Sequence, residues 1–169
     1  MLMWDIRKLI VRMLIPGFLG LGLLFSGPVS ADALQYSLQD LHGNTQSLNR
    51  YREKWVIINF WATWCGPCIS EIPELVAFAD RRLEQVRVVG IAFEKTPVDE
   101  IRAFVAEFGV TYPVLMIGEQ PLVPMEPLKG LPSTFLISPE GQVVVSHVGP
   151  VTAEQLTHWL AQHARGESN

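Results

Sequence analysis

The central part of the chain alternates predicted strands and helices. Residues 55–60 and 86–93 are apolar and rich in β-branched side chains, as expected of strands buried on both faces. Between them, residues 66 to about 82 have helical periodicity, and Pro73 is expected to kink this helix. Its predicted apolar stripe consists of Ile69, Ile72, Leu75, Val76 and Ala79. This order of elements is that of an α/β domain.

The same pattern continues toward the C-terminus. A helix is predicted over residues 97–108, ending at Gly109. Thr96 is a suitable cap residue, a proline follows it directly, and an acid lies three positions after the cap. Residues 114–117 form a short apolar strand or edge segment. Residues 118–129 contain three prolines, and an irregular loop is preferred to a polyproline II ligand because only one turn of such a helix would result.

The last predicted elements are a hairpin and a helix. Residues 133–137 and 143–148 form an antiparallel hairpin across a Pro- and Gly-containing turn. Thr152, with Gln155 three positions later, caps a final helix that runs to about His163.

Residues 34–38 alternate apolar and polar side chains before a turn at 40–44, which predicts an N-terminal β-hairpin. The whole pattern predicts an α/β fold: a central mixed sheet of four strands flanked by helices on both faces, with the N-terminal hairpin as an extension. With 169 residues, 49% of them hydrophobic, the chain fits one domain plus an apolar segment.

Two cysteines follow the first buried strand directly, in the sequence Cys65-Gly66-Pro67-Cys68. Pro67 suits a helix start because its φ is fixed, so Cys65 is expected just before a helix and Cys68 inside its first turn. Unpaired N–H groups and the helix dipole favour a thiolate there. We therefore predict that Cys65 is the nucleophile and that Cys68 resolves the mixed disulfide by closing a Cys65-Cys68 bridge.

Other uses of a cysteine pair fit less well. A purely structural bridge would add little stability, because stabilisation of this kind grows with loop length. A zinc site would need a second C-x-x-C or suitably spaced histidines, and His42, His147, His158 and His163 show no such spacing. A copper-handling module with the two cysteines as Cu(I) ligands remains the alternative function, although no Met or His ligand run lies nearby.

The segment Phe60-Trp61-Ala62-Thr63-Trp64-Cys65-Gly66-Pro67-Cys68 resembles the active site of thioredoxin-like proteins. Asn59 stands where thioredoxin itself has a buried Asp, as in the extracytoplasmic TlpA/ResA branch of thiol-disulfide oxidoreductases. The later Gly130-Leu131-Pro132-Ser133-Thr134-Phe135-Leu136-Ile137 is similar to the second signature of that branch. The resemblance covers residues 34–160 and implies a thioredoxin fold.

The resemblance also implies roles for particular residues. It implies a cis peptide at Leu131-Pro132, which would expose the backbone of Leu131 to an extended substrate. Trp64, Gly66 and Pro67 are expected to contact substrate around the dithiol. Glu94, at the end of the second strand, is the candidate catalytic or pKa-tuning acid.

Peroxidases of the same fold have a different arrangement around their reactive cysteine. Those proteins carry an activating Thr three residues before a lone reactive Cys. Thr63 lies only two residues before Cys65, and a second cysteine follows, so the peroxidase interpretation is disfavoured.

The first 33 residues have the layout of a secretory signal. Arg7, Lys8 and Arg12 form a basic region, residues 13–25 are uncharged and apolar, and small residues follow up to 33. Cleavage before Leu34 is preferred to cleavage before Asp32, and an uncleaved membrane anchor is the alternative. The domain would then cover residues 34–169. The chain is acidic, with a net charge of −4, which argues against nucleic-acid partners.

The sequence therefore predicts an exported thiol-disulfide oxidoreductase that works in the periplasm or on the extracytoplasmic face of the membrane. The expected direction is reduction of protein disulfides, with a membrane thiol donor resetting the pair. The resemblance suggests apocytochrome c or copper-site cysteines as clients. A monomer is expected, with no metal and no cofactor besides the Cys65-Cys68 disulfide.

Overall fold

The computed structural model describes residues 31–81 and 84–164, and the predicted signal segment lies outside them except for its last three residues. In chain order, the elements are β1 (Ser37–Gln39), β2 (Thr45–Ser47), the 3-10 helix η1 (Leu48–Tyr51), β3 (Trp55–Trp61), α1 (Gly66–Ala79), β4 (Val86–Ala92), α2 (Val98–Glu107), β5 (Val114–Met116), β6 (Ser133–Ile137), β7 (Val143–Val148) and α3 (Ala153–His163).

The main sheet has the strand order β5-β4-β3-β6-β7. β3 pairs in parallel with β4 and antiparallel with β6, so the direction is mixed as predicted. The sheet has five strands rather than four, because β5 pairs in parallel with β4 from Gly90 opposite Val114 onward. β1 and β2 form the expected separate hairpin, which a bridge between Asp40 and Leu115 joins to the edge of the main sheet.

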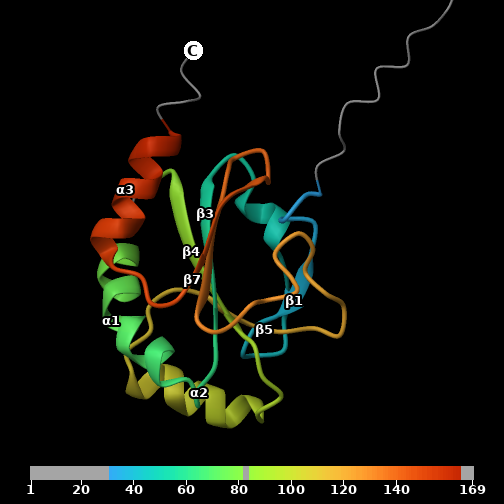
Figure 1. Cartoon of the computed structure of the whole chain (residues 1–169). Helices are drawn as coiled ribbons and strands as arrows, with labels where there is room; N and C mark the ends of the chain where they lie inside the picture. The colour runs from blue at the N-terminus through green and yellow to red at the C-terminus, as the bar shows by residue number, and fades with distance from the viewer. Residues whose placement is uncertain (1–30, 82–83, 165–169) are drawn as a thin grey trace, which may run out of the picture.

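The two faces of the sheet bury alternate side chains of β3. Ile57 and Trp61 belong to a cluster that includes residues of α1, α2 and α3, whereas Val56, Ile58 and Phe60 pack with residues of the N-terminal segment, η1 and the 118–129 loop. In Figure 1, α1 and α3 flank one side of the sheet, α2 crosses its lower end, and β1 and η1 lie on the other side. The predicted fold class is confirmed, and the helical cover of the second face is the short helix η1.

The two predicted helix caps have different outcomes. Thr152 accepts a hydrogen bond from the Gln155 N–H at 3.1 Å, so the cap of α3 is confirmed. The predicted cap of α2 is wrong, because Pro97 occupies the N-cap position and no side chain caps the helix. The Thr96 hydroxyl instead donates to Oε2 of Glu94 at 2.5 Å. This charge-assisted bond turns the Thr96 side chain toward Glu94.

The packed unit begins before residue 34. Ala33 and Leu34 are fully buried, and the Ala33 N–H donates to the carbonyl of Gly141 at 2.9 Å. Asp32 forms an ion pair with Arg52 and accepts the Leu34 N–H. Cleavage before Leu34 would remove these contacts, whereas cleavage before Asp32 would keep them. Within the described ranges, no helix combines the length and the apolar character that crossing a bilayer requires.

Candidate active site

The two cysteines lie where β3 leads into α1. Cys65 is the N-cap residue of α1, and its Sγ accepts a hydrogen bond from the backbone N–H of Cys68 at 3.3 Å. Cys68 lies inside the first turn, after Gly66 and Pro67, and the two sulfur atoms form a disulfide. The predicted placement of both cysteines is confirmed. The Cys65 thiolate, once formed by reduction, would lie at the positive end of the helix, where backbone N–H groups stabilise it.

A shallow groove of about 560 Å³ runs beside Cys65. Its lining consists of Trp64, Cys65, Gly66, Pro67, Phe93, Leu128, Lys129, Gly130 and Leu131. Trp64 stands out of the surface with 69% of its area exposed, whereas Cys68 is 1% exposed and does not line the groove. Of the two cysteines, only Cys65 therefore borders the groove, and its role as the nucleophile stays a prediction.

The Leu131-Pro132 peptide bond is cis, as the resemblance implies. Leu131 lines the groove, and Pro132 is buried behind it, where its carbonyl accepts the Gly149 N–H at 2.9 Å. Of the residues expected to contact substrate, Trp64, Gly66, Pro67 and Leu131 thus surround the groove. Pro132 supports the groove without lining it.

A buried carboxylate lies one helical turn after Cys68. Glu71 is 2% exposed, and its Oε1 accepts a hydrogen bond from Nδ2 of Asn59 at 2.8 Å. Its Oε2 accepts the backbone N–H of Val151 at 2.9 Å. Asn59 also donates to the Thr134 hydroxyl at 3.1 Å, so three elements of the fold meet at this carboxyl.

Burial raises the pKa of Glu71 from its ordinary value of 4.5 to about 7, and the hydrogen bonds from Asn59 and Val151 only partly oppose this effect. Residues three apart on a helix lie on one face, so Cys68 and Glu71 share the buried side of α1. A carboxyl group with a pKa near neutrality beside a buried thiol is suited to accept and return a proton.

Glu71 was not predicted from the sequence. Its signal is its position: Cys68, Glu71, Ile72, Leu75 and Phe78 are the buried residues of α1, at helical spacing. The predicted stripe shares only Ile72 and Leu75 with this set. An acid in the middle of a buried stripe is the observation that would have identified it.

Glu94 holds the loop before the dithiol. Its Oε1 accepts the backbone N–H of Thr63 at 2.7 Å, and its Oε2 accepts the hydroxyls of Thr63 at 3.0 Å and Thr96 at 2.5 Å. Only 9% of Glu94 is exposed. The carboxylate therefore connects the end of β4 to the segment that leads into Cys65, and all of its hydrogen bonds run to the two threonines.

The Thr63 hydroxyl bears on the peroxidase interpretation. An activating threonine would have to direct its hydroxyl at the reactive sulfur, but this hydroxyl donates to Glu94. Within residues 31–81 and 84–164, no group of three or more His, Cys, Asp or Glu side chains is arranged to hold a metal ion.

A thioredoxin fold with a C-x-x-C pair at the start of a helix, open to a groove on the side of the first cysteine, defines the class of thiol-disulfide exchange proteins. The chain belongs to the AhpC/TSA family, whose sequence profile matches residues 29–146.

Similar proteins indicate which branch of this class the chain resembles. The thiol-disulfide oxidoreductase ResA of Geobacillus kaustophilus is 32% identical over 135 residues, which cover 78% of this chain and 76% of the relative. ResA of Bacillus subtilis is 29% identical over 140 residues, which cover 82% and 78%. The crystal structure of a thiol:disulfide interchange protein of the thioredoxin family from Chlorobium tepidum matches with a TM-score of 0.70 and 26% identity, over 81% of this chain and 98% of that one. The resemblance to the TlpA/ResA branch and the assignment as a thiol-disulfide oxidoreductase are confirmed.

Proposed function

We propose that this protein reduces disulfide bonds of exported proteins outside the cytoplasm. The observation that carries the proposal is the asymmetry of the dithiol: Cys65 caps a helix at the wall of a groove, while Cys68 is buried on the same helix face as the acid Glu71. An asymmetric pair suits a reaction in which one thiol meets the client and the other stays inside. The relatives named ResA support the same reaction class.

The reaction starts from the reduced pair. The Cys65 thiolate attacks one sulfur of a client disulfide, a bond forms between the two, and the other client sulfur leaves as a thiolate that takes up a proton. The Cys68 thiol then gives its proton to Glu71 and attacks Sγ of Cys65, which releases the second client thiolate. The client gains two electrons, and the protein is left with the Cys65-Cys68 disulfide seen in this structure. A thiol donor at the membrane returns the two electrons.

Glu94 acts as a positioning residue in this proposal. Glu94→Gln would remove the negative charge and put an N–H₂ donor where Oε2 accepts two hydroxyls, so the Thr63 and Thr96 hydroxyls would have to turn and accept instead. We expect the free energy of unfolding to fall by about 1 to 3 kcal/mol, since hydrogen bonds to a charged group are replaced by weaker bonds between neutral groups. Chemical denaturation and the rate of insulin reduction would both be measured.

The control for this prediction is Glu119→Gln, because Glu119 is exposed and meets only Lys95, at 3.9 Å. It should change neither quantity. Alkylation of the cysteines across pH separates positioning from a direct effect of charge on the thiols. The sequence-based expectation requires the titration midpoints to fall in Glu94→Gln, whereas a pure positioning role leaves them in place.

The function itself is tested with Cys68→Ser in cells. Without the resolving thiol, Cys65 should stay bound to its clients as mixed disulfides, which can be isolated and identified. Apocytochrome c and the copper-site cysteines of an oxidase are the two candidate client classes. If no mixed disulfide accumulates, and the wild-type domain does not reduce insulin, the proposal is wrong. Stoichiometric Cu(I) retention by the reduced domain without reductase turnover would support the copper-handling alternative.

A further inference from the structure

The groove beside Cys65 is apolar except for one cation. Trp64, Pro67, Phe93, Leu128 and Leu131 supply its apolar walls, and Lys129 is the only charged residue that lines it. Lys129 is exposed, and it belongs to none of the ion pairs in the described part of the chain. A client segment in this groove would therefore meet a positive charge that no neighbour in the lining neutralises.

Three acids lie near the groove but outside its lining. Glu94, Glu119 and Glu126 line an adjacent pocket that shares Phe93 with the groove. Glu94 is bound by Thr63 and Thr96, as described above, and Glu119 pairs with Lys95. Glu126 accepts the backbone N–H of Leu122 at 2.6 Å. The oxygens of Glu94 and Glu126 are thus occupied by other partners, and none of the three acids lines the groove, so Lys129 is the charged side chain that a segment in the groove meets directly.

The wall that carries Lys129 is held in place by the rest of the fold. Lys129 ends the irregular 118–129 loop, in which Leu122 and Met125 are 1% and 2% exposed and belong to the core under the sheet. The Tyr36 hydroxyl donates to the carbonyl of Val123 at 2.9 Å, and the Ser133 hydroxyl donates to that of Gly130 at 2.7 Å. A loop that buried side chains and hydrogen bonds anchor in this way loses little conformational entropy when a client binds.

We propose that Lys129 is a specificity-determining residue, which favours client segments with an acidic side chain close to the reactive cysteine. The inference rests on the proposed function. Lys129 is two residues from Leu131, and successive residues of an extended client advance by about 3.3 Å. An Asp or Glu within about two or three positions of the client cysteine therefore comes within reach of the ammonium group. The apolar walls accept the flanking aliphatic or aromatic side chains.

The test uses two disulfide-bonded peptides that are identical except for Asp or Lys two residues from the reactive cysteine. Wild-type protein should reduce the Asp peptide with a kcat/KM about two- to fivefold higher, the range expected for one exposed ion pair. The ratio should shrink as ionic strength rises, because salt screens exposed charges. Lys129→Glu should reverse the preference.

Lys95→Glu is the matched control. Lys95 is also exposed, and Lys95→Glu changes the net charge by the same amount as Lys129→Glu. Lys95 pairs with Glu119, however, and lies outside the groove lining. It should keep the wild-type preference. Equal loss of preference in Lys95→Glu and Lys129→Glu would mean that overall charge decides, and it would overturn the role of Lys129.

The charge preference of the groove and the proposed function can be disproved separately. Wild-type protein that reduces insulin and both peptides, with equal rates at low salt, overturns the charge preference alone. Wild-type protein that reduces neither the peptides nor insulin overturns the proposed function and the preference with it.

Discussion

Replacing Cys65 with serine should abolish insulin reduction. Cys65 is the cysteine that lines the groove, and a serine hydroxyl at the same helix N-terminus is not ionised at neutral pH, so no nucleophile is left for the first attack. The measurement is the rate of insulin precipitation with dithiothreitol as the electron source, compared with the uncatalysed rate.

Cys68→Ser is the companion variant. It removes the same disulfide from the folded chain, so any loss of stability is shared, but it keeps the attacking thiol. We expect it to form one mixed disulfide per molecule and then to stop. If Cys68→Ser turns over at the wild-type rate, or if Cys65→Ser retains activity, the assigned order of attack is incorrect.

The second large effect is expected at Glu71, where the pKa of about 7 makes stability depend on pH. In the unfolded chain this carboxyl releases its proton near 4.5, whereas in the folded disulfide form it keeps the proton up to about pH 7. The folded state therefore binds more protons between these values, and stability falls as pH rises through this window. The difference corresponds to about 3 kcal/mol at and above pH 7.

Glu71→Gln should remove this pH dependence, because an amide does not ionise. It should also slow insulin reduction at pH 7 by about 10²-fold, the lower end of the range for loss of a positioned proton acceptor. Denaturation of the oxidised protein between pH 4 and 8 gives the first result, and single-turnover kinetics gives the second. A variant that is as fast as wild type would show that Cys68 loses its proton elsewhere.

Glu74→Gln is the control on the same helix. Glu74 accepts the Ala153 N–H at 2.9 Å, much as Glu71 accepts that of Val151, but its side chain is only partly buried. It should lose some stability and keep the fall in stability between about pH 4.5 and 7 that Glu71 causes. The comparison separates the docking of α3 from proton transfer.

The elements that the sequence predicts correctly are those with strong local signals. β3 is apolar apart from Asn59, and the Thr152 cap of α3 is short-range chemistry that needs no knowledge of the rest of the fold. β5 has three residues, and its membership of the sheet depends on pairing with Gly90, far away in sequence. A short apolar segment does not itself reveal its partner.

The residues of the site also differ in how far the sequence predicts them. Cys65 and Cys68 carry their chemistry in their spacing, and four groove residues follow from the resemblance, namely Trp64, Gly66, Pro67 and Leu131. Phe93, Leu128 and Lys129 also line the groove, and the sequence did not predict them. The two acids are different, because the partner of each carboxylate is decided by tertiary structure. Thr63 and Thr96 meet at Glu94 only after β3 and β4 pair, and Asn59 and Val151 reach Glu71 from separate parts of the chain.

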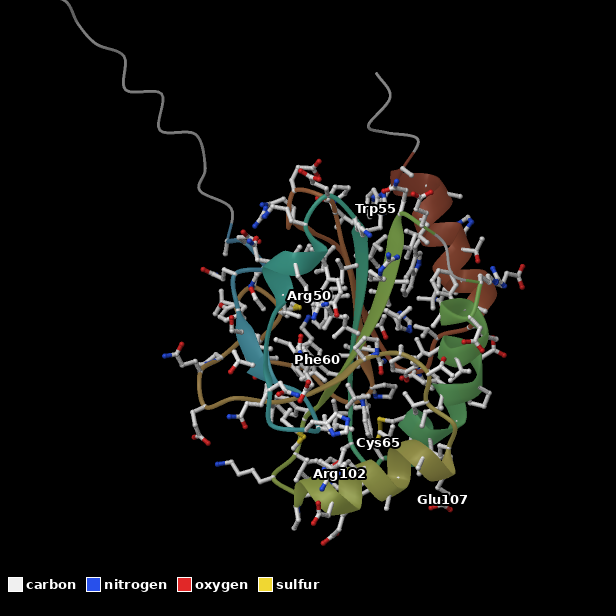
Figure 2. The ribbon with its side chains drawn as sticks, turned by 180° about the vertical axis from the view of Figure 1, so that it is seen from behind. Arg50, Trp55, Phe60, Cys65, Arg102 and Glu107 are labelled. Carbon is white, nitrogen blue, oxygen red and sulfur yellow. A yellow bond between two sulfur atoms is a disulfide. The ribbon has the colours of Figure 1, made fainter. Side chains whose placement is uncertain are left out.

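The contact between Asp32 and Arg52 fixes the direction from which the N-terminal segment enters the domain. Arg52 lies just before β3, whereas Cys65 lies just after it, and seven residues of strand separate the two ends by about 23 Å. Figure 2 shows Trp55 and Cys65 at these opposite ends. If the chain were tethered to a surface at residue 31, the dithiol would therefore face away from that surface. Clients would then bind at the end of the domain farthest from it.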